Sequence, residues 1–295
     1  MTDYLIPLIT VASTFGAAFA GQFFAHKYAR QREKEKHLKE SLQNLYSPLV
    51  YRILDYLNEE CEKSLRTINP YLGEVEVDVP HIPEENTNEM FRSILTFIGE
   101  NLTYADQNLM MKYEIANKFG EFNYGQDKSS LVSTISSFGI RIELCSAFVS
   151  EYLLINKELK TLSKRVRDEI ESLYFFSLVV KILIELRVHT LAIDYSLRHK
   201  DTIIAGFKIK KGLLNEAETI CKRSDNIIDN LEDYSRLESE ELEADALHLI
   251  LELVDCMEMF EPEIAKLWLL QLNEHRDKEE QQTKDIIKKF AEYNN

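Results

Sequence analysis

The sequence predicts an all-α protein in which an N-terminal single transmembrane helix precedes a cytosolic multi-helix bundle. Sheet-rich folds need many turns, yet the 295 residues include only 9 Gly and 6 Pro. Apolar residues also recur at spacings of three and four, the pattern of amphipathic helices. We divide the chain into a transmembrane helix (4–25), a basic juxtamembrane helix (26–66), a Pro-containing connection (67–86) and an acidic helical-bundle domain (87–295).

The predicted transmembrane helix is the stretch from Tyr4 to Ala25, which contains no charged residue. Its 22 residues make a helix of about 33 Å, enough to cross a hydrocarbon core of roughly 30 Å. A cleavable signal peptide is the competing interpretation. It requires a basic leader, and the leader here is Met-Thr-Asp. We therefore expect an uncleaved anchor.

A belt of basic residues follows the apolar stretch. The positive-inside rule places this side in the cytoplasm and the N-terminus outside. We therefore expect a single-pass protein of the inner (plasma) membrane that contacts the lipid bilayer and has a cytoplasmic C-terminal domain. The basic belt consists of Lys27, Arg30, Arg32, Lys34, Lys36 and Lys39.

Small residues recur every fourth position within the apolar stretch and form two adjacent rows. Such rows let two helices approach closely in lipid, where packing drives association. One interpretation is an oligomerising anchor, and the other is the ordinary abundance of Gly and Ala in membrane helices. The rows are Ala12, Gly16 and Ala20, and Ser13, Ala17 and Gly21.

The juxtamembrane helix has leucines at a 4-3-4 spacing, at positions 38, 42, 45 and 49, which is too short a run for a coiled coil. We expect Pro48 to bend this helix or to begin a new one. The amphipathic segment 45–57 either packs in a core or lies on lipid headgroups. Its LYSPL motif, after an N-terminal span and a charged helix, resembles bacterial membrane-anchored proteins over about the first 60 residues. That resemblance implies a bacterial protein and no particular activity.

The connection 67–86 contains alternating VEVDV, so a short strand or an ordered loop is expected there. We expect a turn at 123–128, and a helix N-cap at Ser129 or Ser130. The helical stripes after the connection run from Phe91 to Tyr113, from Leu131 to Tyr152, over 168–198 as the most apolar and central helix, over 213–235, from Leu242 to Met257, and from Pro262 onward.

No cofactor and no catalytic site is expected from the motifs. The chain has no GxxxxGK[ST] or GxGxxG phosphate loop, no HExxH and no GxSxG turn. Two carboxylate–imidazole pairs could each share a helix face, Glu185 with His189 and Asp245 with His248. Neither pair is duplicated as a di-metal bundle requires, so salt bridges are expected in place of a metal site. Arg32 and His37 fit a loose ribonuclease spacing, but they lie within the basic belt.

The remaining polar features have plain explanations. Cys61, Cys145, Cys221 and Cys256 are far apart in sequence and are expected to be buried, reduced thiols. The acidic run from Glu238 to Asp245 suits a solvated helix N-terminus, and binding of a cation or a basic partner is the alternative.

The net charge separates the two ends of the chain. Residues 1–40 carry six basic and four acidic residues, a net charge of +2. The rest of the chain has a net charge of −17, which gives the total of −15. Such a body repels phosphate backbones, so nucleic acid is not an expected partner. We expect a non-enzymatic, membrane-anchored interaction, scaffold or regulatory protein that binds a protein partner or itself. The alternatives are an anti-phage or toxin-like effector that oligomerises in the membrane, and an enzyme with a site assembled from scattered residues.

Overall fold

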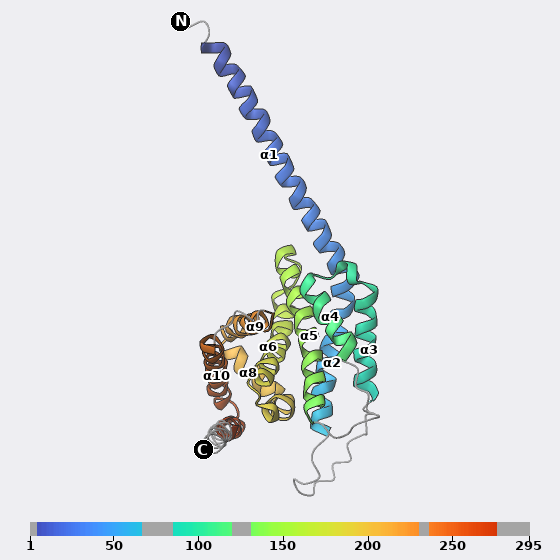
Figure 1. Cartoon of the computed structure of the whole chain (residues 1–295), viewed down its shortest axis with the longest axis vertical. Helices are drawn as coiled ribbons and strands as arrows, with labels where there is room; N and C mark the ends of the chain where they lie inside the picture. The colour runs from blue at the N-terminus through green and yellow to red at the C-terminus, as the bar shows by residue number, and fades with distance from the viewer. Residues whose placement is uncertain (1–4, 67–84, 120–130, 230–235, 276–295) are drawn as a thin grey trace, which may run out of the picture.

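The computed structural model describes residues 5–66, 85–119, 131–229 and 236–275, and every regular element in these ranges is helical (Figure 1). The side chains of residues 5–21, 63–66, 85–86, 131–136, 227–229 and 236–237 lie outside the described set. The all-α prediction is confirmed for this part of the chain. The helices are α1 (Leu5–Ser41), α2 (Ser47–Arg66), α3 (Glu85–Glu100), α4 (Gln107–Phe119), α5 (Leu131–Leu159), α6 (Lys164–Glu185), α7 (Ser196–Arg198), α8 (Lys200–Ile209), α9 (Leu213–Asp229), α10 (Arg236–Glu258) and a further helix at 262–275.

α1 projects from the body as one long helix, and only its C-terminal end reaches the bundle (Figure 1). Most of the predicted transmembrane segment 4–25 lies outside the residues whose side chains are described, although its backbone is helical from Leu5. Within the described residues, no helix combines the length and the hydropathy that a membrane span needs.

α1 continues into α2 through a single π-helical turn, Leu42–Tyr46. Pro48 is the second residue of α2 and directly follows the π-helical turn. The helical path passes through it without a break, so the prediction that it begins a separate helix is wrong. Tyr46 is fully buried, and its ring centroid lies 4.9 Å from that of Phe148. Segment 45–57 therefore packs in the core, and four further members of it, Leu45, Leu49, Ile53 and Tyr56, are also fully buried.

The stripe from Phe91 to Tyr113 was expected to be one helical face, and that prediction is wrong. α3 ends at Glu100, and α4 begins at Gln107 after a 3₁₀ turn, Leu102–Tyr104. The Asn101 side-chain amide donates to the Phe97 carbonyl at 2.9 Å and helps end α3. The Asp106 carboxylate accepts from the backbone N–H groups of Asn108 and Leu109 and caps α4.

The predicted helix over 168–198 is also broken. α6 ends at Glu185, and Arg187 adopts a left-handed φ of 59°. The Val188 N–H donates to the Leu183 carbonyl at 3.0 Å, and the Arg187 N–H donates to the Ile184 carbonyl at 3.0 Å. These two bonds form a Schellman motif, which normally has Gly at the left-handed position. Because Arg occupies that position, no Gly marks this helix end.

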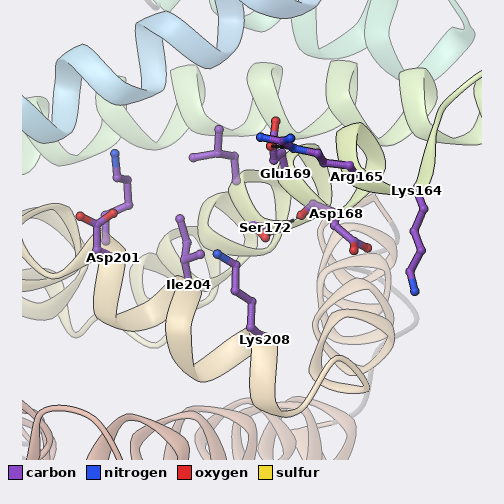
Figure 2. A pocket seen from close by; sticks show the side chains of 10 residues that line it. Lys164, Arg165, Asp168, Glu169, Ser172, Asp201, Ile204 and Lys208 are labelled. Atoms are coloured by element: carbon purple, nitrogen blue, oxygen red, sulfur yellow. Dashed lines mark hydrogen bonds and ion pairs between the residues drawn. The ribbon is translucent and has the colours of Figure 1, made fainter.

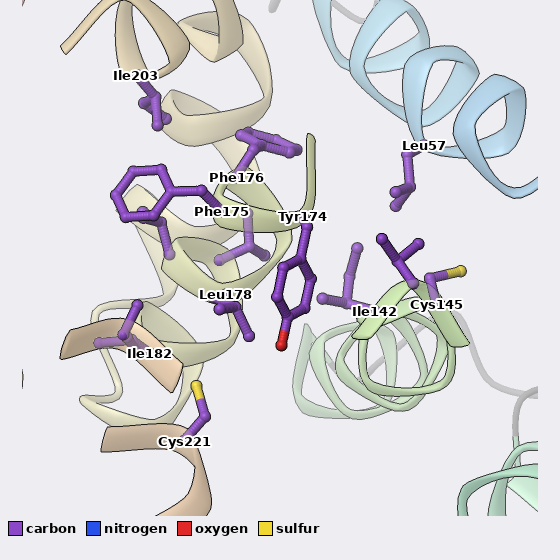
Figure 3. Close-up of a cluster of buried hydrophobic side chains, with 14 of the residues drawn as sticks. Leu57, Ile142, Cys145, Tyr174, Phe175, Phe176, Leu178, Ile182, Ile203 and Cys221 are labelled. Carbon is purple, nitrogen blue, oxygen red and sulfur yellow. The ribbon is translucent and has the colours of Figure 1, made fainter. Parts of the chain in front are cut away.

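α6 is the centre of the bundle, as expected, because α5, α8 and α9 all pack against it. Figure 3 shows Phe175 and Leu178 of α6 on the side of α8 and α9, with Tyr174 turned toward Ile142 of α5. The rings of Phe175 and Phe207 stack with centroids 4.6 Å apart. The described side chains of the other stripes are buried as predicted in α5 and α10, and the helix at 262–275 begins at Pro262.

The remaining local predictions have mixed outcomes. The connection 67–86 lies outside the described residues except for its last two positions, which are helical. The predicted turn at 123–128 and the caps at Ser129 and Ser130 also lie outside them. All four cysteines are free thiols; Cys61, Cys145 and Cys221 are buried, and Cys256 is half-buried.

Candidate functional site

The basic belt lies on the projecting part of α1, where every side chain from 22 to 37 is exposed. We call residues 26–37 the stalk. Lys34 of the stalk pairs with Glu158 at the end of α5, with Nζ and Oε2 3.1 Å apart. Lys27, Arg30 and Arg32 make no ion pair with any described residue. Their charges are therefore available to an anionic surface.

Exposed aromatic side chains lie directly before and among these charges. Phe23 is 61% exposed, Phe24 54% and Tyr28 61%. The rings of Phe23 and Phe24 meet edge to face with centroids 6.0 Å apart. Large apolar groups at this exposure on a projecting stretch of helix are unusual for a surface facing water. The two rows of small residues, from Ala12 to Gly21, lie outside the residues with described side chains.

A cluster of ion pairs around the buried Lys181, which we call the buried ionic cluster, lies where α4, α5, α6 and α9 meet; its other four members are half-buried. The Lys112 ammonium is 2.8 Å from Glu143 Oε2 and 3.1 Å from Asp225 Oδ1. The Lys181 ammonium is 2.9 Å from the same Asp225 oxygen and 3.7 Å from Glu185 Oε1. The cluster thus joins two cations to three carboxylates across four helices.

The electrostatics of the cluster favour fixed charges over reactivity. Burial opposes the charge of Lys112, but Glu143 and Asp225 outweigh it and raise the pKa of that ammonium. The pKa of Lys181 is raised as well, against burial, by the acidic groups around it. Burial raises the pKa of Glu185 to about 7, although Lys181 opposes the shift. Neither lysine is therefore a nucleophile at neutral pH, and Glu185 is the group in the cluster that titrates near pH 7.

The buried thiols are equally unreactive. Burial raises the pKa of Cys61 to about 12 and that of Cys221 to about 12, and it raises the pKa of Cys145 as well. Because the thiolate is the reactive form, these cysteines act as core side chains. Figure 3 shows Cys221 beside Ile182 and Leu178 in the apolar core.

An open surface groove of about 770 Å³ runs between α6 and α8 (Figure 2). Its charged groups are of both signs and partly neutralise one another. Lys211, just after α8, bonds to Asp168 Oδ1 at 2.7 Å, and Arg165 Nε is 3.4 Å from Glu169 Oε1. The Ser172 hydroxyl donates to the backbone carbonyl of Asp168 at 2.7 Å, so it is not oriented by a base. The groove shows no nucleophile–base pair.

The two carboxylate–imidazole pairs of the sequence are not brought together. α6 ends between Glu185 and His189, so that pair does not share a helix face. Asp245 instead pairs with Arg223, with Nη1 and Oδ2 2.5 Å apart, and His248 Nε2 lies 3.5 Å from a Glu252 oxygen. Among the residues described, no group of three or more His, Cys, Asp or Glu could hold a metal ion.

Sequence reasoning missed the buried ionic cluster. Its one local signal was Lys181, a cation inside the most apolar run of the chain. Its partners could not be identified, because Glu143 is 31 residues from Lys112 and Asp225 is 113 residues from it.

Comparison with known proteins found no match for this chain. No family model matches it, and neither a curated protein nor a solved structure does.

Proposed function

We propose that this chain is a single-pass membrane protein whose helical body binds a protein partner at the cytoplasmic face of the inner membrane. The observation that carries the proposal is α1. It is a 37-residue helix, and it runs from the uncharged N-terminal stretch through the stalk into the packed core. A helix of this length is about 56 Å long, so it can cross a bilayer and still extend beyond it.

The chemistry along α1 supports this arrangement. The uncharged stretch 4–25 is followed at once by the exposed aromatics and the free cations Lys27, Arg30 and Arg32. This order matches the sequence of hydrocarbon, interface and anionic headgroups at the inner face of a membrane. Eight residues of the stalk, 26–33, precede Lys34, which pairs with Glu158 of the body. They would hold the body roughly 12 Å from the interface.

The chemistry of the body favours a binding role over catalysis. Its buried lysines are held protonated, its three buried thiols have raised pKa values, and its open groove lacks a nucleophile–base pair. Turnover of nucleotides, lipids or RNA by the purified chain would contradict this part of the proposal.

Membrane fractionation tests the anchor. The full chain is expected in the membrane pellet, and alkaline carbonate should not extract it. A variant lacking residues 1–25 keeps the stalk charges and is expected in the soluble fraction. A matched control, Lys27→Gln with Arg30→Gln and Arg32→Gln, keeps the apolar stretch and should stay in the pellet. Release of the full chain by carbonate would show peripheral attachment and overturn the anchor.

We further propose that the rows of Ala12, Gly16 and Ala20 and of Ser13, Ala17 and Gly21 let two α1 helices pack in the membrane. Replacing Gly16 and Gly21 with Leu fills the close-approach surface. It should reduce chemical cross-linking of the full chain in membranes, whereas Ile9→Leu should not. Equal cross-linking in all three would contradict the packing. Membrane depolarisation on expression that the Leu substitutions abolish would instead favour an effector.

A further inference from the structure

An apolar hollow of about 130 Å³ lies where α10 meets the helix at 262–275 and the chain that follows α6. Leu247 and Leu251 of α10 line one side, and Leu269 and Leu272 line the other. Leu247, Leu251 and Leu269 are each more than one third exposed although they border a cavity. An apolar cavity of roughly 150 Å³ holds a benzene molecule, so this hollow is the size of one aromatic ring.

The surroundings of the hollow are strongly acidic. Residues 236–275 contain 11 Asp/Glu and 2 Lys/Arg. Glu243 lines the hollow itself, and Glu243, Leu247, Leu251 and Asp255 follow one another at helical spacing along the exposed side of α10. Neither Glu243 nor Asp255 forms an ion pair within the described residues. This charge selects an occupant with an apolar anchor between basic residues.

The C-terminal part of the chain, beyond the described residues, contains such a sequence. Residues 284–290 read Lys-Asp-Ile-Ile-Lys-Lys-Phe. The spacing of Ile286, Ile287 and Phe290 predicts one apolar helix face, with Lys284 and Lys288 on an adjacent row and Lys289 close by. The segment thus has the anchor and the charge that the hollow requires.

The connection between the two is long enough. His275 is the last described residue, and it lines the hollow. The 11 residues from there to Ile286 can span roughly 36 Å when extended. A short tether also gives the segment a millimolar effective concentration at its own hollow, which favours the same chain over another copy.

We propose that residues 284–290 fold back onto their own chain, with Phe290 in the hollow between α10 and the helix at 262–275 and the lysines beside Glu243 and Asp255. The segment would then occupy a surface that an external basic amphipathic helix could otherwise use. This inference holds whether or not α1 spans a membrane.

Site-specific photo-cross-linking of the full chain in detergent tests the proposal. A benzophenone amino acid at position 290 should cross-link to peptides containing Leu247, Leu251 or Leu269 within a single chain. The matched control carries the same group at position 292, which the helical spacing assigns to the opposite face, and should not cross-link there. Leu251→Lys places an ammonium in the hollow and should abolish the cross-link at 290. Leu251 is partly exposed, so this variant should still fold. Unchanged fluorescence of the buried Trp268 checks that it does.

A charge exchange separates docking from a general structural effect. Glu243 lines the hollow, so Glu243→Lys should weaken the cross-link, and adding Lys288→Glu should restore it. Cross-links between two chains, with a yield that rises with concentration, would identify a second copy as the occupant and overturn the proposal. Equal yields at 290 and 292, or no effect of Leu251→Lys, would overturn it as well.

Discussion

Lysine–carboxylate pairs lie in two contrasting parts of this molecule, the C-terminal end of α1 and the buried ionic cluster. Near the end of α1, Lys39 and Glu35 are 2.8 Å apart with side chains 58% and 52% exposed. In the cluster, Lys181 and Asp225 are 2.9 Å apart, and the Lys181 side chain is only 7% exposed. The distances are nearly equal, so the comparison shows how far burial alone sets the energetic weight of an ion pair. Water screens both partners of the first pair, whereas in the second it reaches Asp225, 32% exposed, but hardly reaches Lys181.

The sharpest test of this contrast is Lys181→Ala. Removing this ammonium leaves Asp225 with Lys112 as its one cation among the described residues. The side chain of Asp225 is still 32% exposed, so unfolding should become easier by roughly 2–3 kcal/mol, less than for a fully buried pair. The measurement is urea denaturation of the full chain in detergent, followed by the fluorescence of its single Trp, the buried Trp268. Lys222→Ala, an exposed lysine on α9, is the matched control and should be near neutral. A loss below about 1 kcal/mol at Lys181 would show that the cluster is not held as described.

The next test uses the proton of Glu185. Its pKa is raised to about 7 from an ordinary value of 4.5, so between these pH values the folded chain keeps a proton that the unfolded chain has lost. Stability should therefore fall as pH rises through this window, with the full penalty above about pH 7. Glu185→Gln removes the penalty and should be more stable than the parent by about 1–3 kcal/mol at pH 8, with no difference near pH 4.5.

The control for that prediction is Glu169→Gln, an exposed glutamate of the same helix. Its stability relative to the parent should not change between the two pH values. If Glu185→Gln destabilised the chain equally at pH 4.5 and pH 8, the Glu185 carboxylate would be charged at both pH values. That result would contradict the raised pKa that burial gives Glu185.

The smallest effect is expected near the end of α1. Lys39→Ala removes an exposed i,i+4 pair and should change the free energy of unfolding by less than about 0.5 kcal/mol. Raising the salt concentration should reduce even that difference, because exposed pairs are screened. A loss comparable to that of Lys181→Ala would mean that burial does not explain the contrast between the two sites.

Apolar spacing predicted the helices and their buried faces, but it could not locate every break. Phe91 and Tyr113 keep the same helical register although they lie on two helices, because a short turn can preserve the spacing. Asp106 caps α4 but was not identified from the sequence, because a single Asp within an apolar stripe does not by itself mark a helix start. Arg187 gave no signal at all, since its left-handed conformation is fixed by the bonds at the end of α6.

Of the two charged sites, one could be predicted from the sequence and the other could not. The basic belt could be found from sequence because it depends on neighbours in the chain. The cluster of Lys112, Glu143 and Asp225 depends on packing between distant helices, and no local pattern contains that information.

The continuous path from α1 into α2 has a mechanical consequence. Residues 22–41 contain neither Gly nor Pro, so no residue of that stretch provides a hinge. The π-helical turn at its base is held by Leu45 and Tyr46, both fully buried. A tilt or rotation of the outer end of α1 should therefore be transmitted through the helix to Tyr46 and to the core beside Phe148.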